Sequence, residues 1–249
     1  MTRVALIIQY DGSDYSGWQK QKQVITVQET IEKKIKELSN QEIKIFAAGR
    51  TDAGVHAEGQ VAHLDIKKKL TLKNILLGMN FYISKEKFGE NISIKKVSRV
   101  PNDFSARFSV RKKIYCYKIY NKEYKSPLNL KNTWWVSKKI NVSNMQKAAK
   151  FLLGKHDFSS FRTTGCQSSS PNKTIESILI KKNKNIIFIT FVGRSFLYNQ
   201  VRIMTGTLKD VGTGLITPQR FKEILKDRKR SSAGITAPSK GLTLMKIFY

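Results

Sequence analysis

The sequence predicts an α+β fold built from two ferredoxin-like halves, with a mostly antiparallel mixed sheet. The first part of the chain follows the order β-α-β-β-α-β, which is the split βαβ arrangement of ferredoxin-like domains, and the second part repeats this order loosely. A chain of 249 residues that is 40% hydrophobic is also large enough to bury a sizeable core. We therefore expect helices on one face of an antiparallel sheet, and a long cleft between two similar units.

The first half begins with the apolar run 4–10, which predicts a buried strand because the turn residues Asp11-Gly12-Ser13 follow it. Thr26 and Glu29 have the spacing of a helix capping box, and apolar residues then recur at helical spacing on one face. The remaining expected elements of this half are strands over 43–47, 60–66 and 92–97 and a helix from Thr71 to Met79.

The second half contains four expected strands and several helices. The strands span 112–121, 175–182, 186–192 and 242–248, one helix spans 144–153, and further helices follow residue 192. Turn-forming residues at 101–105 predict the boundary, so the expected domains are residues 1–104 and 105–249. This boundary is not a flexible Gly/Ser linker, which leaves open that the halves share one continuous sheet.

The charge of the chain calls for an anionic partner. Lysine and arginine number 46 against 18 aspartate and glutamate residues, which gives a formal net charge of +28. Nucleic acid is favoured over a membrane, because the longest apolar runs have the length of strands and the N-terminus has no signal-peptide pattern. We therefore expect a cytoplasmic location. The alternative is that many of these lysines only solvate the surface.

Cysteine and histidine do not form a recognisable metal or disulfide pattern. The two cysteines, Cys116 and Cys166, lack CxxC spacing, and the three histidines do not share a helical face. The sequence predicts neither a zinc site nor a disulfide framework.

The segment from Gly49 to Ala57 is the strongest candidate for chemistry. It joins two expected strands and carries small residues on both sides of Asp52, so a substrate could approach the carboxylate closely. The neighbouring Arg50 should favour the ionised carboxylate, which suits a nucleophile or a base. The alternative is an aspartate that binds its own backbone in a turn.

The segment Gly49-Arg50-Thr51-Asp52-Ala53-Gly54-Val55-His56-Ala57 resembles the catalytic signature of the TruA family of tRNA pseudouridine synthases. Other segments resemble the family in the same order: 10–12 (YDG), 17–19 (GWQ), 104–109 (FSARFS), 115–121, 165–168 (GCQS), 196–197 with 201–202, 236–238 (TAP) and 241–242. This resemblance implies the pseudouridine synthase fold, with RRM-like halves around a central basic cleft.

The resemblance also implies an activity. Uridine at positions 38, 39 and 40 of the tRNA anticodon stem-loop would be isomerised to pseudouridine, with Asp52 as the nucleophile. Substrate and product are neutral isomers, so no cofactor or metal is implied. The family further implies a homodimer whose partner is the anticodon arm of tRNA.

Two more residues match catalytic positions of the family. Tyr115 matches the tyrosine that stacks on the target base, and strand alternation places it on one face with Lys113 and Tyr117. The alternative for Tyr115 is ordinary packing in a strand. Arg202 matches the arginine that pairs with the catalytic aspartate, and the alternative for Arg202 is a phosphate contact.

Helical spacing indicates how Arg202 is presented. One stripe of side chains is expected to face the core and consists of Val201, Met204, Leu208 and Val211. A second stripe is expected to face the cleft and consists of Tyr198, Arg202, Thr205 and Lys209. The residue before Val201, Gln200, departs from the bacterial pattern, which often has methionine there.

Aromatic and basic residues supply candidate RNA contacts. We expect Arg50 and Arg107 at the RNA backbone and Trp18 and Phe108 at unstacked bases, with core packing as the alternative for the aromatic residues. Two other functions stay open: a related synthase with broader RNA targets, and a catalytically inactive RNA-binding relative. The intact set of Asp52, Tyr115 and Arg202 argues against the inactive relative.

Overall fold

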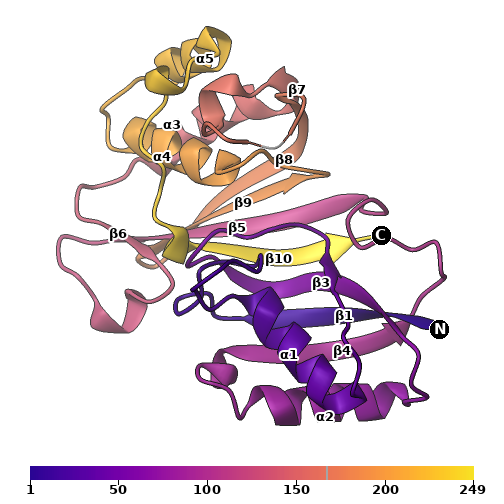
Figure 1. The fold of residues 1–249 in the computed structure, drawn as a ribbon. Coiled ribbons are helices and arrows are strands. Elements are labelled where there is room, and N and C mark those ends of the chain that lie inside the picture. Colours follow the sequence, from indigo (N-terminus) through magenta and orange to yellow (C-terminus); the bar gives the residue numbers. More distant parts are fainter. Residues whose placement is uncertain (167) are drawn as a thin grey trace. The chain divides into compact units, whose positions relative to one another are not determined.

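The protein, described by a computed structural model over residues 1–166 and 168–249, divides into two compact units (Figure 1). The first unit comprises Met1–Arg111 with Leu244–Tyr249, and the second comprises Lys112–Thr243. Gln167, part of one family-like segment, lies outside the described residues. Contacts assign residues 105–111 and the end of the chain to the first unit, whereas the sequence pattern groups them with the second half. The division of functional domains at residue 104 stays a prediction.

The first unit has the predicted order of strands and helices. Its elements are β1 (Thr2–Tyr10), α1 (Val27–Ser39), β2 (Phe46–Ala47), β3 (His56–Ile66), α2 (Leu72–Ile83), β4 (Ile92–Arg99) and most of β10 (Leu242–Phe248). The sheet order is β4-β1-β3-β10, β2 pairs with β3, and β1 is antiparallel to both neighbours. This mostly antiparallel sheet confirms the α+β class for the unit (Figure 1).

The helices of this unit begin where the sequence predicts. Thr26 Oγ1 accepts a hydrogen bond from the backbone N of Glu29, and the face formed by Val27, Ile31 and Ile35 is fully buried. The predicted α2 cap, Thr71, accepts from Asn74 N at 3.0 Å. Cap and apolar spacing agree, so both helices could be placed from the sequence.

Strand β3 begins at His56, earlier than the predicted strand over 60–66. At two other boundaries that differ from the prediction, side chains replace or extend backbone bonding. Strand β2 is two residues long instead of spanning 43–47, since Glu32 of α1 accepts from Ile45 N at 3.0 Å and takes that N–H out of the ladder. Helix α2 extends past Met79 to Ile83, because the Asn80 amide exchanges hydrogen bonds of 2.8 and 2.9 Å with the backbone of Ile94.

The second unit is also a mostly antiparallel sheet with helices. Its elements are β5 (Lys112–Asn121), β6 (Trp134–Val136), α3 (Val142–Ala149), β7 (Gly154–Asp157), β8 (Asn172–Asn183), β9 (Ile186–Gly193), α4 (Gln200–Gly212) and α5 (Pro218–Asp227). Its sheet order is β5-β9-β8-β7, and β6 runs parallel to β5. The short strands β6 and β7 have no alternating run long enough to be predicted.

Six 3₁₀ turns complete the described elements: Gly89–Asn91, Pro127–Asn129, Lys150–Leu152, Ser159–Phe161, Arg230–Ser232 and Ser239–Gly241.

The core of the second unit contains Tyr117, Phe158, Phe161, Phe191 and Phe221, each completely buried. Within the described part of the chain, no helix is both long and apolar enough to cross a membrane.

Candidate active site

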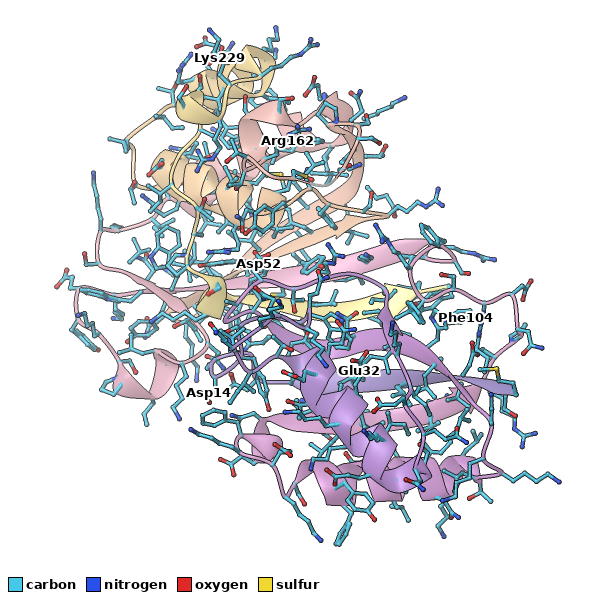
Figure 2. All side chains as sticks on the ribbon, in the orientation of Figure 1. Asp14, Glu32, Asp52, Phe104, Arg162 and Lys229 are labelled. Carbon is cyan, nitrogen blue, oxygen red and sulfur yellow. The ribbon has the colours of Figure 1, made fainter. Side chains whose placement is uncertain are left out.

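Asp52 lies in the loop that connects β2 to β3, and it is partly exposed to solvent (Figure 2). The loop closes on itself, because Val55 N donates to the carbonyl oxygen of Asp52 at 3.1 Å. Gly54 has a φ of +75°, a left-handed value that glycine adopts without strain. Ala48 N donates to Val61 O at 2.8 Å and fixes the start of the loop on β3. The backbone around Asp52 is therefore well defined.

Two glycines let other segments pack directly on this loop. A Cβ on Gly12 would lie 2.1 Å from Val55 O, and a Cβ on Gly17 would lie 2.8 Å from Thr51 O. Gly17 also has a φ of +88°. The family-like segments 10–12 and 17–19 therefore carry glycine because any side chain would collide with the backbone beside Asp52.

Buried polar groups hold the first residues of the loop. Tyr10 Oη and Thr51 Oγ1 are 2.7 Å apart, and Gln60 Nε2 donates to Gly49 O at 2.8 Å. Burial raises the pKa of Tyr10, so its phenol keeps its proton at neutral pH. Trp18 N donates to Thr51 O at 3.0 Å. These three contacts come from three separate segments and fix the backbone on the N-terminal side of Asp52.

The Trp18 indole is buried, with 2% of its surface exposed, and its ring centroid lies 6.1 Å from that of Tyr10. This is the packing role that the sequence left as an alternative. In this position the ring packs on Tyr10, whose hydroxyl bonds to Thr51, and it does not present a surface for an RNA base.

His56 ties the other side of the loop to the end of β1. Its Nδ1 atom lies 3.2 Å from Gly12 N and 3.0 Å from Asp11 Oδ1. Burial tends to raise the pKa of Asp11, but hydrogen bonds from Ser13 and the nearby His56 outweigh burial and lower it. Asp11 therefore stays ionised at neutral pH beside the imidazole.

Tyr115 lies on β5 in the second unit, opposite Phe191 of β9, and is partly exposed. Its ring meets Phe196 edge to face, with centroids 5.3 Å apart and an interplanar angle of 87°. Tyr117, two residues further on, is completely buried and its hydroxyl donates to Pro238 O at 2.7 Å. Phe196 thus fixes the orientation of the Tyr115 ring.

Arg202 lies in the first turn of α4, where two acceptors fix its guanidinium. Nε donates to Ala237 O and Nη1 donates to Asn199 Oδ1, each at 2.8 Å. Asn199 precedes the helix with a φ of 60°, and its amide also donates to Thr163 Oγ1 at 3.0 Å. Burial raises the pKa of Tyr117, and the nearby Arg202 charge acts in the opposite direction.

The segment that contacts Arg202 packs along α4 because Gly206 has no side chain. A Cβ on Gly206 would lie 1.9 Å from Ile235 O. The stripe of Val201, Met204, Leu208 and Val211 is buried as expected. The second stripe is only partly exposed, since Thr205 is completely buried. The family-like segment 236–238 therefore holds Arg202 through Ala237 and Tyr117 through Pro238.

The expected RNA-binding residues other than Trp18 lie at the surface of the first unit. Arg50 and Arg107 are exposed, and Phe108 is 75% exposed with the Arg107 guanidinium carbon 5.3 Å from its ring centroid. In contrast, Phe104 packs on Tyr249 with ring centroids 4.8 Å apart. In segment 104–109, Phe104 therefore packs against the protein, whereas Phe108 is exposed to solvent.

Sequence reasoning assigned no role to several residues that hold the site. Gln60 and Asn199 lie in no recognisable motif, and only the neighbouring glycines hinted at the tight packing of the loop. Among the described residues, no group of three or more His, Cys, Asp or Glu side chains is arranged to hold a metal ion.

Known proteins with similar sequences identify the family. Residues 6–109 and 148–249 match the family described as tRNA pseudouridine synthase. A tRNA pseudouridine synthase A of Anaplasma phagocytophilum is 45% identical over 99% of this chain and 100% of its own length. Proteins of the same name from Bartonella henselae and a Thermoanaerobacter species are 41% and 39% identical, each with full coverage of both chains. The chain therefore belongs to the tRNA pseudouridine synthase family.

Proposed function

We propose that this protein isomerises uridine to pseudouridine in tRNA, with Asp52 as the nucleophile and without a cofactor. The observation that carries the proposal is the packing of the Asp52 loop. Segments 10–12 and 17–19, which resemble the family pattern together with the Asp52 segment, contact that loop through Gly12 and Gly17. Relatives that are 45% and 41% identical to this chain over their full length are named tRNA pseudouridine synthase A.

The reaction conserves atoms and charge. The Asp52 carboxylate attacks either C1′ of a flipped-out uridine or its uracil ring, and the bond between N1 and C1′ breaks. The base then rotates, C5 bonds to C1′, and the bond between the substrate and the Asp52 carboxylate breaks, which restores the free carboxylate. The C5 proton leaves, and N1 gains a proton. No electron acceptor or hydrolytic water is consumed, so general acid–base and nucleophilic groups suffice.

Tyr115 is proposed to stack on the target uracil and to take part in proton transfer at C5. The support comes from its position: it is partly exposed on β5, and the perpendicular contact with Phe196 fixes the plane of its ring. A preoriented ring loses little entropy when a base stacks on it.

Arg202 is proposed to pair with the Asp52 carboxylate and orient it. Hydrogen bonds to Ala237 O and Asn199 Oδ1 set the plane of the guanidinium, so its orientation within the second unit is defined. Contact with an RNA phosphate is the other role that a positioned arginine can serve, before or after the carboxylate pairing.

The finer expectations are proposed on the same family basis. They are the three anticodon-arm positions as targets, a homodimeric enzyme, a cytoplasmic location, and RNA contacts by Arg50, Arg107 and Phe108. The surface positions of these three side chains and the net charge of +28 support the RNA contacts.

The test is to incubate the purified protein with an unmodified tRNA transcript and to map pseudouridine along it. Pseudouridine confined to the anticodon arm supports the proposal. Pseudouridine outside that arm indicates a relative with broader targets. No pseudouridine in any transcript, with tight tRNA binding retained, indicates an inactive RNA-binding relative.

A further inference from the structure

Residues 17–26, between β1 and α1, form a loop whose two ends are joined by backbone hydrogen bonds. Ser16 N donates to Ile25 O at 2.9 Å, and Val27 N donates to Gly17 O at 3.2 Å, so the two ends of the loop are joined. Inside it, Lys20 N donates to the Gln28 side chain at 3.1 Å. These bonds give the loop a defined shape against the start of α1.

A hollow lies between the tip of this loop and α1. Its lining residues are Lys20, Gln21, Lys22, Gln23, Val24, Ile25, Glu29 and Lys33. Three lysines face one carboxylate, Glu29, whose Oε1 lies 3.6 Å from the Lys20 Nζ. The hollow therefore has a surplus of positive charge and attracts anions.

The other lining groups fit a sugar-phosphate chain better than a small anion. Val24 and Ile25 are 38% and 40% exposed, and two glutamine amides lie between the lysines. Ammonium groups bind phosphate oxygens, while amides and apolar side chains can contact ribose hydroxyls and base edges. Lysines that alternate with amides, next to two exposed apolar side chains, suit single-stranded RNA.

The base of the loop contacts the backbone beside Asp52. Trp18 N donates to Thr51 O, and Gly17 packs against the same carbonyl group. The hollow is thus connected to the candidate nucleophile within one unit, through a loop whose two ends are tied together. The loop that carries the hollow is therefore in direct contact with the backbone of the residue before Asp52.

We propose that the Lys20–Lys22–Lys33 hollow binds the phosphate backbone of the RNA next to the target uridine. This proposal rests on the proposed function for its ligand, but it concerns binding, not the reaction. It predicts that the hollow sets the affinity for tRNA and its salt dependence without contributing to the chemical step.

The test is a triple variant, Lys20→Gln, Lys22→Gln and Lys33→Gln, compared with a matched control, Lys67→Gln, Lys68→Gln and Lys69→Gln. All six lysines are exposed and lie in the first unit, so neither variant disturbs the core. The equilibrium dissociation constant for tRNA transcript is measured by filter binding between 50 and 300 mM KCl, roughly the range in which counterion release is resolved.

We expect the hollow variant to bind tRNA at least about tenfold more weakly, with its salt slope reduced by about 2, at ~0.7 for each of three lost phosphate contacts. The kcat at saturating tRNA should stay within about twofold of the wild type, since the chemical step is unaffected. The control should bind like the wild type. Equal affinity and equal salt slopes for the hollow and control variants would overturn the proposal.

A gain of affinity provides a test that misfolding cannot imitate. Glu29→Gln removes the carboxylate from the hollow and keeps the backbone N–H that Thr26 caps. We expect this variant to bind tRNA several-fold more tightly at low salt. Unchanged or weaker binding contradicts the proposal.

Competition distinguishes an acidic protein partner. A poly-glutamate peptide that binds the wild type but not the hollow variant, while both proteins bind tRNA equally, would assign the hollow to an acidic peptide and overturn the RNA proposal. Because these are binding measurements, a failure here leaves pseudouridine formation to be judged separately by the mapping experiment.

Discussion

The Nδ1 atom of His56 lies within hydrogen-bond distance of both the Asp11 carboxylate and the backbone N of Gly12, at 3.0 and 3.2 Å. One ring nitrogen can donate to Asp11 or accept from Gly12, but it cannot do both at once. In either arrangement it joins the end of β1 to β3, which begins at His56 itself, four residues after Asp52.

The two ring nitrogens of His56 can be tested with two amides. Asparagine places a polar atom near the position of Nδ1, whereas glutamine reaches toward the position of Nε2. We expect His56→Asn to keep most of the kcat and His56→Gln to lose about 1–2 kcal/mol of transition-state stabilisation, as expected for an unsatisfied buried N–H at Gly12. Single-turnover kinetics measure this, and equal rates for the two variants would rule out Nδ1 as the positioning atom.

Gly17 should be required for more than its backbone conformation. Gly17→Ala introduces a Cβ 2.8 Å from Thr51 O, so the Asp52 loop must shift. Gly214→Ala is the matched control, because Gly214 has a similar φ of +76° but nothing lies within 4 Å of the added Cβ. Both variants should lose about 1–2 kcal/mol of folding stability from left-handed strain.

Only Gly17→Ala should also lose activity, by at least about tenfold in kcat, because displacing a nucleophile by a fraction of an ångström is costly. Chemical denaturation and turnover assays on the two proteins separate strain from displacement. An equal loss of kcat in both variants would show that the contact with Thr51 is unimportant.

Asn199 should position Arg202 rather than merely start the helix. Asn199→Gly keeps the left-handed backbone but removes the acceptor for Arg202 Nη1, whereas Asn199→Asp keeps an acceptor there. We expect kcat to fall about tenfold for Asn199→Gly and less for Asn199→Asp, with unchanged affinity for tRNA. A loss of affinity with unchanged kcat would instead indicate that Arg202 contacts phosphate.

Acid should weaken the Arg3–Asp65 pair. The Arg3 guanidinium, bonded to Asp65 at 2.8 and 2.7 Å, lowers the pKa of that carboxyl below its ordinary value of 3.8. The pair therefore stabilises the folded protein at pH values above the pKa that Asp65 has in the unfolded chain. This stabilisation is lost as the pH falls through the lower pKa that Asp65 has in the folded protein.

The measurement compares the Tm of the wild type and Asp65→Asn from pH 7 to pH 2. The wild type should have the higher Tm at pH 7, and the two values should converge as Asp65 becomes protonated. Arg3→Gln should give a similar loss at pH 7, and combining the two substitutions should add little. A Tm difference that persists at pH 2 would mean that Asp65 acts through something other than its charge.

Helix caps and apolar spacing in the sequence predicted much of the fold. The cap at Thr26 and the spacing of Val27, Ile31 and Ile35 were sufficient to place α1, because side chains on one face decide its burial. The start of strand β2 could not be predicted, since it depends on Glu32 of a helix accepting a hydrogen bond from Ile45 N. Such a contact between separate elements leaves no periodic trace in the sequence.

In the candidate site, too, some residues could be predicted from the sequence and others could not. Asp52 was found through its small neighbours and its resemblance to a family, whereas the roles of Gln60 and Asn199 depend on the folded positions of Gly49 and Arg202. Trp18 shows the limit of composition: an aromatic residue beside basic ones suggested RNA stacking, but the ring is buried against Tyr10.

The carboxylate of Asp52 is tested most directly by Asp52→Ala, with Asp14→Ala, an exposed aspartate of the same unit, as the control (Figure 2). Pseudouridine formed in a tRNA transcript is measured together with the dissociation constant for that transcript. We expect Asp52→Ala to form no pseudouridine and to bind tRNA within about threefold of the wild type, because binding is spread over many phosphate contacts. Asp14→Ala should be fully active. Pseudouridine formation by Asp52→Ala at a rate near that of the wild type would contradict the assignment of the nucleophile.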